Sequence, residues 1–150
     1  MSGAWVVVAD RGVARLLRAH SPTGALEEFE ALEHPEARLR AQALTSDLPG
    51  RAFDSKGHGR HAMESEVDPR KQEAIEFARR VADRLEAARL HGEIEHLVLV
   101  AAPEFLGLLR DTLSAESRKL VASEHPLNLV AERPEQIRQR LPERLYSSLA

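Results

Sequence analysis

One short segment, residues 97–102, constrains the fold more than any other part of the chain. Its sequence, Leu-Val-Leu-Val-Ala-Ala, is apolar at every position rather than at alternate positions. A strand with this pattern is buried on both faces, which is typical of a central strand with helices packed on each side of its sheet. The segment therefore predicts a layered domain of the α/β or α+β class.

The residues before this strand predict an antiparallel meander. Residues 5–9 are a β-branched run, the turn signal Asp-Arg-Gly follows at 10–12, and residues 14–19 can return as a second strand. After the turn residues Ser-Pro-Thr-Gly at 21–24, a weakly patterned third strand is expected over residues 26–33. Three antiparallel strands thus precede any helix.

The clearest helix signal begins at Asp68-Pro69, where a carboxylate can cap free N–H groups and a proline takes the first helical position. Apolar residues then recur at spacings of three and four to about His91, and Gly92 ends the helix. Later elements are a helix from Pro103 to Leu113, a turn capped by Ser114, an edge strand at 120–122 and a helix over 134–141. The sum is a mixed sheet of about five strands with helices on both faces.

Length and composition set further bounds. The 150 residues fit one domain, here taken as residues 1–150, and the absence of cysteine excludes disulfides and thiol catalysis. The longest apolar run is about half a dozen residues, against about 20 for a membrane span. With no visible secretory signal, we expect a cytoplasmic protein with no membrane partner. No cofactor or metal is predicted.

A long segment without periodicity, residues 34–67, is predicted to be a loop of functional importance. Within it, residues 38–61 hold five basic and two acidic side chains, so this part carries a charge of +3 while the rest of the chain totals −6. Glycines let its backbone approach a partner, and arginines can donate to phosphate. The candidate contacts with RNA or another anion are Arg51, Phe53, Lys56, Gly57, His58, Gly59, Arg60 and His61. The alternative is an exposed, solvated loop.

Catalytic alternatives have less support. His58 and His61 could bind a metal or act as a general base, but the flanking glycines argue against a helix and no third ligand is obvious. Asp10 could hold a metal in a nuclease, although a role in the turn geometry is simpler. The glycine-rich segment does not match a P-loop, and there is no Gly-x-Ser-x-Gly elbow. These patterns favour a binding protein over an enzyme.

Several motifs resemble a known family. Ser-Asp at 46–47, Pro-Gly-Arg at 49–51, Phe-Asp at 53–54 and Gly-His-Gly-Arg-His-Ala-Met-Glu at 57–64 are similar to the signature of the bacterial host attachment proteins. The resemblance extends from about residue 4 to about residue 130. It implies a ribonuclease-H-like fold, similar to the middle domain of archaeal and eukaryotic class-1 peptide-chain release factors and of Pelota.

In release factors, a Gly-Gly-Gln loop at the corresponding place enters the ribosome. Here Gly57-His58-Gly59-Arg60-His61 stands instead, so peptide release is not implied, whereas docking of a basic loop on ribosomal RNA is. We therefore expect a non-enzymatic factor bound to the ribosome or to RNA, acting in translation under stress or in hibernation. The alternatives are an adhesion-linked factor with a protein or polysaccharide partner, and a small hydrolase that uses His58 or His61.

Overall fold

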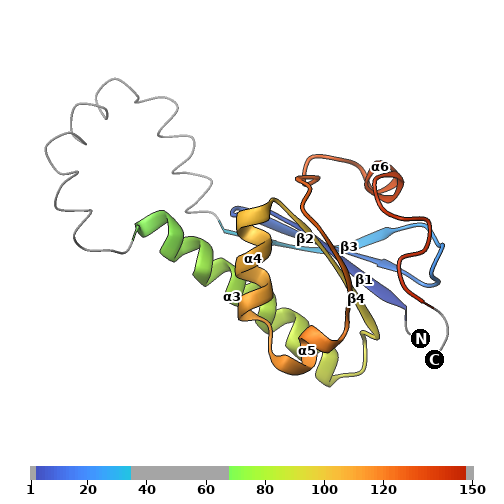
Figure 1. The fold of residues 1–150 in the computed structure, drawn as a ribbon, viewed down its shortest axis with the longest axis horizontal. Coiled ribbons are helices and arrows are strands. Elements are labelled where there is room, and N and C mark those ends of the chain that lie inside the picture. The colour runs from blue at the N-terminus through green and yellow to red at the C-terminus, as the bar shows by residue number, and fades with distance from the viewer. Residues whose placement is uncertain (1–2, 35–67, 148–150) are drawn as a thin grey trace, which may run out of the picture.

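The computed structural model describes residues 3–34 and 68–147, which form a single mixed sheet with helices on both faces (Figure 1). The sheet order is β3-β2-β1-β4-β5. Its strands are β1 (Ala4–Ala9), β2 (Val13–Ala19), β3 (Glu27–Glu33), β4 (His96–Ala101) and β5 (Val121–His125). β1, β2 and β3 form the predicted antiparallel meander, while β1, β4 and β5 run parallel to one another. The predicted fold class is confirmed.

The two central strands, β1 and β4, contribute side chains to two hydrophobic cores, one on each face of the sheet. β1 is buried along its whole length, and β4 is buried from Leu97 to Ala101. Successive side chains point to opposite faces of a strand. Val7 and Leu99 therefore enter one core, and Val6 and Val98 enter the other. The uninterrupted apolar pattern at 97–102 follows from burial on both faces.

The first face is covered by α3 (Pro69–Leu90), α4 (Pro103–Thr112) and α5 (Ala115–Lys119). Asp68 caps α3 by accepting a hydrogen bond from the backbone N–H of Arg70 at 3.0 Å. Gly92 follows the helix with a φ of 74°, a conformation that glycine adopts at little cost. Phe77 of α3 is fully buried and packs near Phe105 of α4. These start and stop signals were predicted from the sequence.

The second face is covered by α6 (Pro134–Gln139) and the irregular segments on either side of it (Figure 1). Leu129, Ile137 and Leu145 are buried against the sheet there. Arg15 of β2 attaches this layer by donating hydrogen bonds to two backbone oxygens, those of Val130 at 2.8 Å and Glu132 at 2.6 Å. The helix–sheet–helix layering is thus complete on both sides.

Most element ends lie within one residue of the prediction, and two differ by more. β5 continues to His125, beyond the predicted end at residue 122, because Ser123, Glu124 and His125 extend an edge strand with polar side chains that give no apolar pattern. α6 ends at Gln139 rather than at Leu141, and the buried Leu141 follows it outside the helix. In β5 polar residues continue a strand, and after α6 a buried apolar residue lies outside the helix, so the polarity pattern does not mark either end.

Candidate functional site

All the contact residues predicted from the sequence lie outside the described residues. They are Arg51, Phe53, Lys56, Gly57, His58, Gly59, Arg60 and His61. The structure therefore leaves their predicted roles as predictions. What it does describe is where the domain connects to this part of the chain.

His34 and Asp68 are the described residues that flank this segment. They adjoin the end of β3 and the start of α3, which lie at one edge of the domain (Figure 1). The backbone N–H of His34 donates to the carbonyl oxygen of Gly12 at 2.9 Å, in the turn that follows β1. The buried ring of His34 packs edge-on against Phe77, with 5.5 Å between the ring centroids. Asp68 begins α3 at the same edge. This is the edge where the parallel strands have their carboxyl ends, the usual side for ligands in sheets with parallel strands.

Asp10, which was considered as a metal-holding acid, performs a structural role at this edge. Its Oδ1 atom accepts hydrogen bonds from the backbone N–H groups of Gly12 at 2.8 Å and Val13 at 2.9 Å. This is the turn geometry that the Asp-Arg-Gly sequence predicts. Within residues 3–34 and 68–147, no group of three or more His, Asp or Glu side chains is arranged to hold a metal ion.

The edge just described is the carboxyl edge of the sheet. A cleft of about 420 Å³ opens at the opposite edge, the amino edge, where β1 begins and β2 ends. The side chains that line it come from the three strands of the meander, from α3 and from the segment before β4. The larger ones are Trp5, Arg18, His20, Phe29, Arg84 and Glu93. Its volume lies in the range of small-molecule sites.

The cleft contains alternating guanidinium groups and aromatic rings. Arg18 lies over the ring of Phe29 at 4.5 Å, Phe29 meets Trp5 edge-on at 4.7 Å, and Arg84 lies 5.3 Å from the centroid of Trp5. Arg84 also donates two hydrogen bonds of 2.8 Å to the carboxylate of Glu30. These bonds lower the pKa of Glu30 and raise the pKa of Arg84. Such contacts fix both guanidinium groups in place.

Sequence reasoning missed this cleft. Trp5 lies in the predicted first strand and is buried in the core, and Arg84 lies on the predicted helix after Asp68, so neither residue stands out in the sequence. One signal was present: the predicted hairpin brings Arg18 opposite Trp5, so a cation and an aromatic ring share one face. The third member, Phe29, lies at a β-bulge in the β2–β3 pairing, which the sequence pattern did not reveal.

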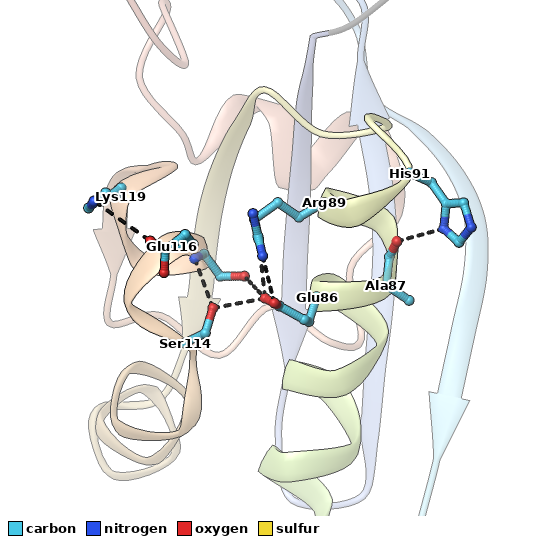
Figure 2. Close-up of polar contacts among 8 residues, drawn as sticks. Glu86, Ala87, Arg89, His91, Ser114, Glu116 and Lys119 are labelled. Carbon is cyan, nitrogen blue, oxygen red and sulfur yellow. Dashed lines mark hydrogen bonds and ion pairs between the residues drawn. The ribbon is translucent and has the colours of Figure 1, made fainter.

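Hydrogen bonds strongly lower the pKa of the Glu86 carboxyl group, and Figure 2 shows its contacts. Arg89 donates to it at 2.6 Å, and the hydroxyls of Ser114 and Ser117 donate at 2.8 and 2.9 Å. These hydrogen bonds, the one from Arg89 first, lower the pKa of Glu86 to about 2. An ionised carboxylate held in this way is a poor general base at neutral pH. Its effect is to connect α3 to α5.

A serine–histidine pair lies on the edge strand β5. The Ser123 hydroxyl and the Nε2 atom of His125 are 2.9 Å apart, and burial lowers the pKa of His125. A nucleophile needs, besides a base, a substrate pocket with oxyanion donors. Neither residue lines the cleft at the amino edge. The pair by itself therefore assigns no hydrolase site.

A family model described as "Protein required for attachment to host cells" matches residues 5–141. No curated protein matches the sequence. A solved structure described as "Archaeal protein" superposes with a TM-score of 0.43 and 11% identity, covering 92% of this chain and 36% of that chain. This chain thus spans about a third of that structure's length.

In the described part of the chain, no helix combines the length and the apolarity needed to cross a membrane. The family model, by contrast, covers most of the sequence, including the central strands, the helices of both layers and the glycine-rich segment. The protein therefore belongs to the family of proteins required for attachment to host cells.

Proposed function

We propose that this protein is a non-enzymatic RNA-binding factor that acts on the ribosome, with residues 38–61 as its contact segment. The observation that carries the proposal is the charge of that segment, which has five basic and two acidic side chains in a chain of net charge −3. Arg51, Lys56 and Arg60 would donate to phosphate oxygens, with His58 and His61 beside them and Phe53 as a stacking group. Phosphate contacts of this kind dominate affinity for nucleic acids.

The ion pairs of the described domain support this assignment. Arg11, Arg15, Arg84, Arg89 and Arg110 each form an ion pair with a glutamate of the same domain. These guanidinium groups are largely neutralised where they lie, so they contribute little to an electropositive surface. The excess of basic residues in the sequence lies instead at 38–61.

The position of the segment in the chain gives a second line of support. It lies between β3 and the long helix α3. The backbone of His34, which follows β3, is held at the carboxyl edge by its hydrogen bond to Gly12, and Asp68 caps the start of α3. The resemblance to release-factor middle domains implies a ribosome-entering loop at the same place. Since Gly-Gly-Gln is absent from the sequence, the proposal is docking on ribosomal RNA without peptide release, as a factor of stress or hibernation would require.

Co-sedimentation with purified ribosomes, repeated at increasing salt, tests the proposal. Affinity should fall linearly on a log–log plot against salt. The double variant Arg51→Glu, Arg60→Glu should bind more than about tenfold more weakly and reduce the salt slope by about 2, since each lost phosphate contact removes about 1.

A matched control changes the same charge elsewhere. The double variant Lys119→Glu, Arg140→Glu has the same net charge, and both residues are exposed on the described domain. It should keep most of the binding. If both double variants lose the same affinity for ribosomes, the overall charge of the protein explains the binding and the segment at 38–61 does not. If the unmodified protein does not co-sediment with ribosomes at low salt, the proposal is wrong.

The family description favours a second candidate, an adhesion-linked factor with a protein or polysaccharide partner. Surface labelling of intact cells separates the two functions. Labelling of the protein from outside, together with failure to co-sediment with ribosomes, would favour adhesion. Protection from the label together with salt-dependent co-sedimentation would favour the ribosomal role.

A further inference from the structure

We propose that the cleft at the amino edge of the sheet binds a small organic molecule with a single carboxylate, and that Arg18 is the residue that holds this group. The inference goes beyond the proposed ribosomal function, because the cleft lies at the edge opposite to His34 and Asp68 and suits a different class of ligand. Neither site needs the other.

In the described part of the chain, Arg18 has unused hydrogen-bonding capacity. Its guanidinium group donates no hydrogen bond within residues 3–34 and 68–147, and its buried Nε atom has no hydrogen-bond partner there. Its one ion pair there, to Glu27, is 3.8 Å long, which is beyond hydrogen-bond distance. A guanidinium group presents five N–H donors in a planar fork that matches a carboxylate. Arg18 is therefore the natural anchor for an anion in this cleft.

Arg18 is also held in position before any ligand arrives. Its guanidinium carbon lies 4.5 Å from the centroid of Phe29, whose ring is supported by Trp5 at 4.7 Å. The side chain is 39% exposed, so its outer part stays accessible from solvent. A donor that is already ordered loses little conformational entropy on binding. The rings beside it offer an apolar wall for the body of the ligand.

The other charged groups limit the charge of the ligand to one. Arg84 is neutralised by Glu30. Glu93 lines the cleft as an exposed carboxylate, and Glu27 lies within 4 Å of both Arg18 and His20. These carboxylates would repel a dianion such as a phosphate monoester. A monocarboxylate carries only one negative charge, which the ion pair with Arg18 balances.

The sole tryptophan of the chain, Trp5, lies in the cleft, so its fluorescence reports directly on occupancy. Benzoate is the probe, its uncharged amide benzamide is the control for the apolar body, and phenyl phosphate is the control for charge. A ligand of this size is expected to bind with a Kd of about 1 mM. Benzoate should therefore saturate the signal, benzamide should bind at least about tenfold more weakly, and phenyl phosphate should also bind more weakly than benzoate.

Three variants assign the effect to Arg18. Arg18→Gln should weaken benzoate binding by about tenfold or more, and Arg18→Lys by a smaller factor, since it keeps the charge without the planar fork. Arg11→Gln removes an exposed arginine that is absent from the cleft, and it should bind like the unmodified protein. Thermal melting shows that each variant is folded. Ribosome co-sedimentation should be the same for Arg18→Gln as for the unmodified protein.

Several results would overturn the proposal. One is the absence of a saturable fluorescence change with benzoate up to about 20 mM, well above the expected Kd. Another is unchanged affinity in folded Arg18→Gln. A third is equal or tighter binding of phenyl phosphate, which would replace the monocarboxylate by a different ligand class. None of these results bears on the contact segment at 38–61.

Discussion

Replacing Arg15 by methionine should destabilise the domain far more than replacing an exposed arginine. Arg15 is 13% exposed and donates to the carbonyl oxygens of Val130 and Glu132 as well as to the carboxylate of Glu28. It therefore joins β2, β3 and the segment that covers the second face of the sheet. Methionine keeps most of the apolar stem and removes every one of these donors.

The magnitude follows from the two carbonyl contacts and the ion pair. Hydrogen bonds from a charged donor contribute about 1.5–3 kcal/mol each. Part of the loss is recovered, because Val130 and Glu132 are only partly buried and Glu28 is 31% exposed, so water can replace the guanidinium. We expect the free energy of unfolding to fall by about 3 kcal/mol, which corresponds to a Tm lower by about 6–12 °C for a domain of this size.

Urea unfolding followed by circular dichroism measures this difference. Arg11→Met is the matched control, since the Arg11 side chain is 43% exposed and forms an ion pair with Glu104 at 3.2 Å. Such a pair contributes about 0–1 kcal/mol. A loss below about 1 kcal/mol for Arg15→Met, or equal losses in both variants, would refute the idea that Arg15 fastens the second layer.

Three further predictions concern stability. Ionised Glu86 contributes stability that is complete above its ordinary pKa of 4.5 and is lost as pH falls toward about 2, so Glu86→Gln should flatten that part of the acid-unfolding curve. The lowered pKa of His125 means that stability rises with pH through the interval just below 6.5, and His125→Gln should abolish this rise in urea unfolding at a series of pH values. Phe77→Ala should cost about 3–5 kcal/mol in the same assay, whereas Leu90→Ala on the same helix, at a residue that is 68% exposed, should change stability by less than about 0.5 kcal/mol.

Much of the fold was predictable because local chemistry and tertiary packing agree in this chain. Asp68-Pro69 and Gly92 mark the ends of α3, and the apolar run at 97–102 marks a strand that is buried on both faces. β5 was harder to delimit. Most of its residues are half-buried, its backbone conformation depends on pairing with β4, and its polar side chains carry no periodic signal.

The cleft was less predictable than the fold, for a physical reason. Its geometry depends on a bulge between Leu16 and Leu17, which shifts the register of β3 against β2, and on Arg84 approaching from a helix far along the chain. An arginine stacked on a ring and an arginine in solvent look the same in sequence. The contact segment, by contrast, was found from charge and glycine content alone, which are properties of the sequence itself.

The position of β1 between β2 and β4 has a consequence for biosynthesis. The meander can form as soon as the first part of the chain leaves the ribosome, but one edge of β1 has its native neighbour only after residues 96–101 have been made. Val6 and Val8 stay uncovered for longer, until the segment with Leu129, Ile137 and Leu145 has also been made. An open apolar edge favours pairing with other chains. Slow translation of the middle of the message should therefore increase aggregation of the nascent protein, whereas chaperones that shield the first strands should suppress it.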